Sequence, residues 1–201
     1  VDLTEIMAEE LKLSVDKDGF NVEMEKQKKL ARENMKFYAC DNDDGEWITV
    51  KEGKSLFVGF KTMIATSKIL KYREKENNIE IILDKTPFYG EKGGQTGDTG
   101  RLFCSICELK VINTRVCESG NAHIVKVVKG VFNDCLKSEI TAEVDSERRK
   151  SIMRNHTATH LLQKVLRITL GEQLQQAGSY VDDEGFRFDF NYHKAIDSAT
   201  I

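Results

Sequence analysis

The sequence lacks a long apolar run, a secretion signal, an excess of one charge and any internal repeat. No stretch approaches the roughly 18 apolar residues that a membrane helix needs, so we expect no membrane partner. Against 33 Asp and Glu stand 30 Lys and Arg, a net charge of -3. That balance excludes a general polybasic binder, and any contact with nucleic acid must rely on local patches. Five cysteines without a secretion signal favour reduced thiols in the cytoplasm over a disulfide framework.

What is present suits one or two ordinary folded domains. The 201 residues are 40% hydrophobic and 31% charged, which is enough apolar surface for a core and argues against general disorder. The chain begins at Val1 instead of Met, and no residue typical of the end of a helix or strand precedes Ile201. We therefore expect a piece of a longer protein.

The hydrophobic period changes twice along the chain. Spacings of three and four predict helices over residues 2–13 and 20–38, followed by an acidic loop at 41–45. Between about 47 and 144, short segments rich in β-branched and aromatic residues predict strands, and the absence of intervening helices suggests a small closed or nearly closed barrel. The expected strands are 48–50, 56–60, 62–72, 79–83, 102–111, 123–128 and 140–144.

A helical period returns after Glu147, and Gly171 is expected to end that helix. Alternating residues then predict two strands, 179–181 and 186–190, joined at 182–185. The second half of the chain is thus predicted to close with a helix and a hairpin.

A glycine-rich loop is the first candidate site. Five of the 14 glycines lie within residues 90–100, after the single proline, Pro87. Glycine permits close approach of the backbone to a ligand, and the Gln95 amide can both donate and accept hydrogen bonds. The spacing does not match a phosphate loop, because neither Gly-Lys-Ser/Thr nor a helix follows. A long hairpin turn without a ligand is the alternative.

A pair of histidines is the second candidate. His156 and His160 are four residues apart, which on a helix places both imidazoles on one face, about 5–6 Å apart at Cβ. This arrangement suits two ligands of a tetrahedral zinc, which needs at least one further protein ligand. Thr157 stands where the zinc-protease motif has glutamate, so that class of protease is disfavoured. Two partly buried, hydrogen-bonded histidines are the alternative.

Four cations lead into the histidine helix. Because cations near a helix N-terminus oppose the macrodipole, a local contact with a phosphate backbone would explain them; a solvated charged face is the alternative. The candidate residues for this contact are Arg148, Arg149 and Arg154.

The cysteines give a weaker signal. Cys104 and Cys107, with Cys117 and His123 further on, are compatible with a metal knuckle, although no second Cys-x-x-Cys is present. Alternation along a strand would send Cys104 and Cys107 to opposite faces. Core or half-buried thiols are therefore the favoured interpretation.

Several motifs, in this order, resemble the editing region of bacterial alanyl-tRNA synthetases, and together they run over most of the chain. They are Thr86-Pro87-Phe88-Tyr89, Gly93-Gly94-Gln95, Gly97-Asp98-Thr99-Gly100, Arg148-Arg149, Asn155-His156-Thr157-Ala158-Thr159-His160-Leu161-Leu162, Gln176-Ala177-Gly178-Ser179 and Arg187-Phe188-Asp189-Phe190. The opening residues 3–10 also resemble the family's segment just before the editing region.

The resemblance implies an α+β fold in three parts. Residues 1–44 would be a helical end of the preceding tRNA-binding region, and residues 45–146 a small antiparallel β-barrel of the translation-factor type. Residues 147–201 would be the first part of an α+β editing domain like the second domain of threonyl- and alanyl-tRNA synthetases. Such enzymes charge tRNA(Ala) in a catalytic domain, absent here, that uses ATP and Mg²⁺. Their editing module hydrolyses Ser-tRNA(Ala) and Gly-tRNA(Ala).

The resemblance also implies roles for single residues. His156 and His160 would be two Zn²⁺ ligands, and both would be catalytic together with Gln95. Gln95 and Gln176 would line the pocket for the misacylated acceptor end of tRNA(Ala), with Ser179 as a weaker pocket candidate. The tRNA would be bound by Arg148, Arg149 and Arg154.

The family's remaining zinc ligands, in a Cys-x-x-x-His arrangement, are expected beyond Ile201. We therefore expect this chain alone to bind zinc weakly or not at all and to edit poorly.

Gly90, Lys92 and Thr96 replace a usual alanine, a serine and an apolar residue in the loop. A freestanding trans-editing deacylase and a non-catalytic RNA-binding barrel are the alternative functions.

Overall fold

The computed structural model divides the chain into two compact units, residues 1–42 and 43–201. It describes residues 16–36, 46–75, 78–193 and 195–196. The helix predicted over 2–13 and the acidic loop at 41–45 lie outside the described residues.

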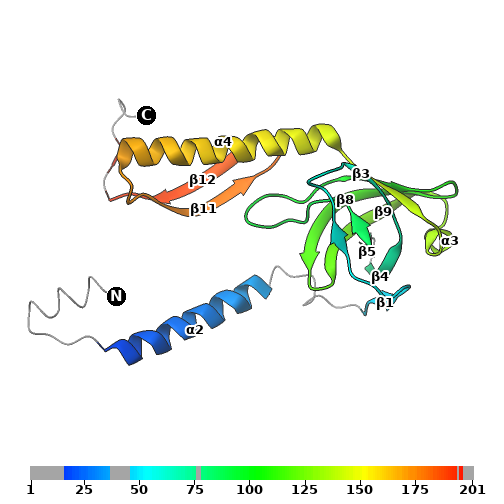
Figure 1. The fold of residues 1–201 in the computed structure, drawn as a ribbon, viewed down its shortest axis with the longest axis horizontal. Helices are drawn as coiled ribbons and strands as arrows, with labels where there is room; N and C mark the ends of the chain where they lie inside the picture. Colours follow the sequence, from blue (N-terminus) through cyan, green and yellow to red (C-terminus); the bar gives the residue numbers. More distant parts are fainter. Residues whose placement is uncertain (1–15, 37–45, 76–77, 194, 197–201) are drawn as a thin grey trace, which may run out of the picture. The chain divides into compact units, whose positions relative to one another are not determined.

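Helix α2 (Lys17–Lys36) is the described element of the first unit (Figure 1). The carboxylate of Asp16 accepts a hydrogen bond from the backbone nitrogen of Gly19 at 2.8 Å, which is an N-cap geometry. The helix predicted over 20–38 is therefore confirmed, with its beginning three residues earlier.

A large antiparallel sheet dominates the second unit, with the strand order β1-β4-β5-β9-β8-β7-β10-β3. A short parallel pair lies beside it, formed by β2 (Leu56–Phe57) and β6 (Lys85–Thr86). The strands of the large sheet are β1 (Ile48–Thr49), β3 (Ile64–Ser67), β4 (Ile69–Lys75), β5 (Asn78–Leu83), β7 (Gly100–Phe103), β8 (Glu108–Cys117), β9 (Gly120–Lys129) and β10 (Ile140–Val144).

The sheet curves strongly (Figure 1), because β3 and β4 are consecutive in the chain but lie toward opposite ends of the strand order. Strand β3 pairs with β10, the last strand but one, whereas β4 pairs with β1 and β5 at the other end. Only Lys68 separates β3 from β4, and its backbone nitrogen donates to Asp84 at 2.7 Å. The concave side encloses a core of fully buried side chains that includes Ile69, Leu83, Phe88, Leu102, Leu109, Val111 and Val125.

The structure confirms the α+β class and most of the expected strands, with three local differences. The strand predicted over 62–72 breaks at Lys68, because its two halves pair with different partners. The strand predicted over 102–111 is divided into β7 and β8 by a turn. Helix α3 (Phe132–Cys135) was not predicted, since a single helical turn is too short to show a period.

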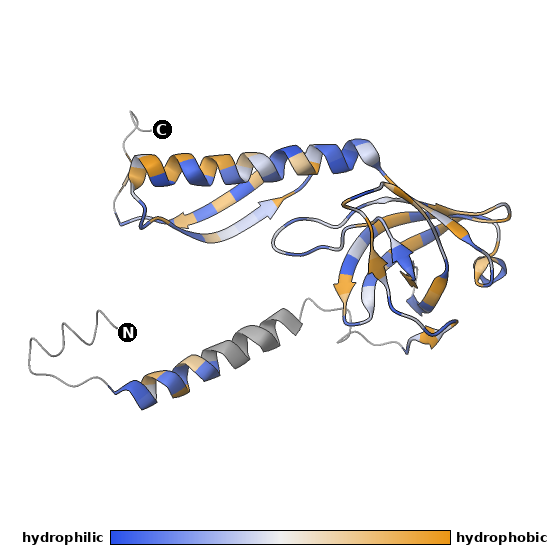
Figure 2. Ribbon diagram, in the orientation of Figure 1, coloured by the Kyte–Doolittle hydropathy of each residue, from blue (hydrophilic) through white to orange (hydrophobic). Residues whose placement is uncertain are grey.

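Helix α4 (Ser146–Leu170) follows the sheet directly. Its N-cap Asp145 accepts a hydrogen bond from the backbone nitrogen of Arg148 at 3.1 Å, and Gly171 at φ 115° ends it as predicted. Leu161, Val165 and Ile168 remain exposed on its C-terminal half, where Figure 2 shows hydrophobic positions recurring. Neither this helix nor α2 has an apolar stretch that would cross a bilayer.

A two-stranded hairpin lies along α4 (Figure 1) and confirms the two strands predicted after this helix. It consists of β11 (Gln175–Val181) and β12 (Phe186–Asn191). One carboxylate oxygen of Asp182 accepts hydrogen bonds from the backbone nitrogens of Glu184 and Gly185, each at 2.9 Å. These bonds close the turn predicted at 182–185.

His123 is fully buried in the sheet and is hydrogen-bonded at both ring nitrogens. Its Nδ1 lies 2.8 Å from the Ile81 carbonyl oxygen, and its Nε2 lies 2.7 Å from the Thr86 hydroxyl. Because the carbonyl only accepts, Nδ1 carries the proton and Nε2 accepts from the hydroxyl. Burial lowers the pKa of His123 to about 4, although the hydrogen bond to Ile81 opposes this shift.

We expect His123 to make the protein less stable as the pH falls from about 6.5 to about 4. In this window the unfolded chain takes up a proton that the folded chain excludes. The free energy of unfolding should fall by about 1.4 kcal/mol per pH unit, roughly 3 kcal/mol in all. Urea unfolding at several pH values should show this contribution as a slope that is smaller by about 1.4 kcal/mol per pH unit in a His123→Gln variant. An imidazole NMR signal of His123 that titrates near pH 6.5 in the folded protein would contradict the expectation.

Candidate functional site

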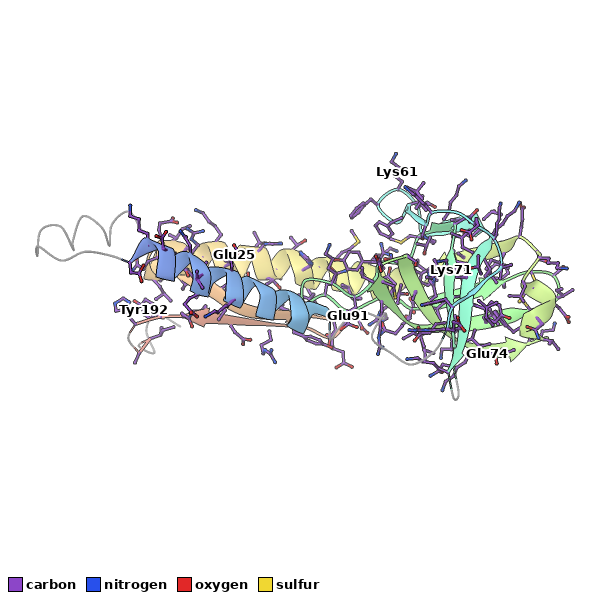
Figure 3. The ribbon with its side chains drawn as sticks, turned by 90° about the horizontal axis from the view of Figure 1, so that it is seen from below. Glu25, Lys61, Lys71, Glu74, Glu91 and Tyr192 are labelled. Carbon is purple, nitrogen blue, oxygen red and sulfur yellow. The ribbon has the colours of Figure 1, made fainter. Side chains whose placement is uncertain are left out.

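The glycine-rich loop, residues 87–99, is fixed to the sheet on one side and to the hairpin on the other. The backbone nitrogen of Glu91 donates to the Thr114 carbonyl of β8 at 2.9 Å; Figure 3 labels Glu91. The backbone nitrogen of Thr96 donates to Val181 of β11 at 3.0 Å, and that of Val181 donates to Gly94 at 2.8 Å. The loop is thus held by backbone hydrogen bonds from both neighbours.

Close packing at Gly94 fixes the loop against β11. Gly94 has φ +82°, and a Cβ placed there would overlap the backbone carbonyl of Ser179. Gly93, with φ +62°, has open space where a Cβ would lie. The two adjacent glycines therefore serve different needs, since Gly94 alone permits the close approach of loop and strand.

The Arg149 guanidinium ties the loop to helix α4 from within the protein. Its side chain is almost fully buried and forms an ion pair with Asp98. It also donates to the carbonyl oxygens of Pro87 at 2.8 Å and Gly59 at 3.2 Å. Burial and the carboxylate of Asp98 raise the pKa of Tyr89, whose backbone nitrogen donates to that carboxylate at 2.6 Å.

This burial weighs against the predicted contact of Arg149 with tRNA. A guanidinium that is already paired with a buried carboxylate and two carbonyl groups has no surface from which to reach a phosphate. In the sequence, the one indication that Arg149 forms an internal ion pair is Asp98, a carboxylate within the glycine-rich loop.

Arg148 is also engaged within the protein. It donates to the Gly97 carbonyl at 2.8 Å and forms an ion pair with Asp183 of the hairpin turn at 2.8 Å. By contrast, Arg154 is exposed and donates to Ser151 at 2.8 Å. Of the three arginines predicted to contact RNA, Arg154 is therefore the one on the open surface.

The structure places His156 and His160 side by side on the helix, as their spacing predicts, and brings Gln95 of the loop into contact with His156. His156 Nδ1 lies 2.7 Å from Gln95 Oε1, and His156 Nε2 lies 3.0 Å from His160 Nε2. Because an amide oxygen only accepts, Nδ1 of His156 carries the proton and its Nε2 lone pair points toward His160. The loop glutamine therefore sets the tautomer of the helix histidine across 61 residues of sequence.

A bulge in β11 decides which side chains share a face with Ser179. The register shifts between Gln176 and Gly178, so that Gln176 pairs with Phe190 and Ser179 pairs with Phe188. Paired residues point to the same side of an antiparallel ladder. Gln176 and Ser179 therefore share the face that also carries the buried Val181. Gln175, paired with Asn191, belongs to the opposite face.

The histidine geometry fits part of a zinc site. With Zn–N bonds of about 2.0–2.1 Å, two imidazole nitrogens on a tetrahedral zinc lie about 3.3–3.4 Å apart. The 3.0 Å separation of the two Nε2 atoms is close to that value, and Gln95 provides the partner that ligating histidines usually have on their other nitrogen. Within the described residues, no group of three or more His, Cys, Asp or Glu side chains could hold a metal ion.

The metal knuckle, which the sequence disfavours, is not assembled within the described residues, and the favoured interpretation of core or half-buried thiols holds for Cys104 and Cys107. His123 is bonded to Ile81 and Thr86, and Cys117 is disulfide-bonded, a bond that the expectation of reduced thiols did not include. Cys104 and Cys107 lie in a turn, with their sulfur atoms 3.4 Å apart. The prediction that they face opposite sides was wrong, because a turn, and not a strand, connects them.

Comparison with known proteins agrees with the motifs. A family model described as "tRNA synthetases class II (A)" matches residues 1–148. The alanine–tRNA ligase of Parabacteroides distasonis is 38% identical over 201 residues, covering 98% of this chain and 22% of the relative. That of Francisella philomiragia is 41% identical over 210 residues, covering 100% of this chain and 24% of the relative.

The chain thus spans less than a quarter of the length of these relatives. The family model nevertheless matches well over half of the chain. The chain therefore belongs to the class II tRNA synthetase (A) family.

Proposed function

We propose that this chain is part of an alanyl-tRNA synthetase and that residues 46–196 belong to its editing region, which hydrolyses Ser-tRNA(Ala) and Gly-tRNA(Ala). The observation that carries the proposal is the bond between Gln95 and His156. It joins two predicted site residues from distant motifs beside a second imidazole. In this proposal the parent enzyme attaches alanine to tRNA(Ala) with ATP and Mg²⁺ in another domain and works in the cytoplasm.

The finer fold assignments belong to the same proposal. The direct connection between β3 at one end of the sheet and β4 near the other end supports a small barrel of the translation-factor type, since it brings the two ends of the sheet together. Helix α4 and its hairpin would then begin the editing domain. The domain limits of 1–44, 45–146 and 147–201 remain predictions.

Hydrolysis of a misacylated tRNA depends more on recognition of the wrong amino acid than on a strong nucleophile. A hydrophobic pocket separates amino acids that differ by one small group by only about 10–200-fold, so a second site that destroys wrong esters is expected. Serine carries a hydroxyl that polar side chains can bind. Its tRNA ester is already activated, so an oriented water suffices for hydrolysis.

Each residue then has a defined task. Gln95 orients His156 through its amide oxygen, and its amide nitrogen is a donor for the substrate. Gln176 and Ser179 present polar groups from the same face of the hairpin. His156 and His160 would hold zinc together with ligands outside the described residues, and bound zinc would supply a Lewis acid. The exposed Arg154 remains a candidate for contact with the acceptor end of tRNA(Ala).

Gln95→Ala should slow the hydrolysis of preformed Ser-tRNA(Ala) by roughly 10–100-fold, because His156 loses the group that fixes its tautomer. The assay uses the chain extended to include a downstream Cys-x-x-x-His. In the same extended protein, His156→Ala and His160→Ala should each lower the bound zinc, measured by mass spectrometry of the metal. If the extended protein binds tRNA but leaves the ester intact, the alternative of a non-catalytic RNA-binding module replaces the proposal.

Adjacent glutamines on β11 offer a matched control. Gln176→Ala should weaken the hydrolysis of Ser-tRNA(Ala), whereas Gln175→Ala, on the opposite face, should not. Equal rates for the two variants would remove Gln176 from the substrate pocket.

A further inference from the structure

Three thiols meet at one end of the sheet, away from the histidine pair. Cys104 and Cys107 lie in the turn between β7 and β8, with their sulfur atoms 3.4 Å apart. The backbone nitrogen of Cys104 donates to the Cys107 carbonyl at 2.9 Å, which closes this turn. Cys135 of α3 is hydrogen-bonded to Cys107 and also donates to the Phe132 carbonyl at 2.8 Å. All three are free thiols.

The two thiols of the turn differ in access. Cys104 is half-buried, whereas Cys107 and Cys135 are 3% and 0% exposed. A small cavity of about 110 Å³ lies at the turn, lined by Cys104 and Cys107, by the cationic Arg101 and Lys129 and by the carboxylate of Glu108. The Cys104 sulfur is therefore accessible to a small reagent, and the buried Cys107 sulfur lies 3.4 Å from it.

The local electrostatics assign the order of reaction. Burial alone would raise the pKa of the Cys104 thiol, but hydrogen bonds from the backbone of Ile106 and Cys107 and from the Cys107 thiol together lower it. Burial raises the pKa of Cys107, and the neighbouring thiols add to that shift. Since the thiolate is the nucleophile, Cys104 reacts first.

We infer that Cys104 and Cys107 form an oxidisable dithiol that a small hydroperoxide converts to an intramolecular disulfide. The Cys104 thiolate attacks one peroxide oxygen, the O–O bond breaks, and the departing hydroxide takes up a proton to leave as water. The Cys107 sulfur then attacks the resulting sulfenic acid and releases a second water with its own proton. The two thiols together lose two electrons and two protons, and hydrogen peroxide takes up both to become two waters.

A metal site fits the same cysteines less well. Among the residues that the structure describes, no three potential ligands are arranged to hold a metal ion. The Cys135 sulfur is engaged with a backbone carbonyl, and the pair with the short separation is Cys104 with Cys107.

Digestion with trypsin distinguishes a disulfide between Cys104 and Cys107 from one that involves Cys135. Cys104 and Cys107 lie in one peptide, residues 102–110, and Cys135 lies in another, residues 130–137. After treatment of the folded chain with hydrogen peroxide, the first peptide should lose the mass of two hydrogens and accept no alkylating reagent. The second peptide should still be alkylated once the chain is denatured, and dithiothreitol should reverse the change.

Three serine variants complete the test. Cys107→Ser should accumulate a sulfenic acid at Cys104 that dimedone traps, and Cys104→Ser should react with peroxide at least about tenfold more slowly than the original chain. Cys135→Ser should still form the disulfide, with circular dichroism as the check that each variant folds. Cross-linking of the two peptides, alkylation of Cys104 after peroxide, or stoichiometric zinc that is lost in Cys104→Ser would each overturn the inference.

Discussion

Arg149→Met is expected to lower the free energy of unfolding by about 3–5 kcal/mol, the range for removal of one partner from a buried ion pair. The substitution leaves the carboxylate of Asp98 buried without its cation, and it removes the donors to Pro87 and Gly59. Urea unfolding should show a lower midpoint with an unchanged slope, since the surface exposed on unfolding stays similar.

Arg154→Met is the matched control, because Arg154 is exposed on the same helix. It should change the free energy of unfolding by no more than about 0.5 kcal/mol. Asp98→Asn combined with Arg149→Met should cost less than the sum of the two single changes, because the residues interact directly. Equal midpoints for Arg149→Met and Arg154→Met would show that the buried pair does not hold the loop to α4.

Gly94→Ala is expected to lower the hydrolysis of Ser-tRNA(Ala) by about 100-fold in the extended protein described above. The added methyl group would overlap the Ser179 carbonyl, so the loop must move away from β11 and carry Gln95 away from His156. A displacement of about 1 Å of a positioning group is enough for a loss of that size.

Gly93→Ala separates this steric effect from backbone strain. Both glycines have positive φ, but a methyl group at Gly93 meets open space. Gly93→Ala should therefore cost only about 1–2 kcal/mol of stability from the left-handed backbone and keep most of the activity. If both variants edit equally well, the docking of the loop on β11 is not what positions Gln95.

Local patterns were sufficient for the elements that depend on neighbours in sequence. Helix α4, its end at Gly171 and the hairpin of β11 and β12 follow from period, a C-cap glycine and a turn with Asp182. The same holds for the two imidazoles, since a spacing of four on a helix puts them together whatever the rest of the chain does.

The sequence by itself determined the α+β class, the helix that carries His156 and His160, and the motifs that lead to the family. Only the tertiary structure decided that Arg149 is an internal tie to Asp98, that the strand predicted over 62–72 breaks at Lys68 into β3 and β4, and that Cys104 faces Cys107. The physical reason is that burial, ion pairing and strand register depend on segments far apart in sequence. A run of cations or a Cys-x-x-Cys reads the same whether its side chains meet solvent or one another.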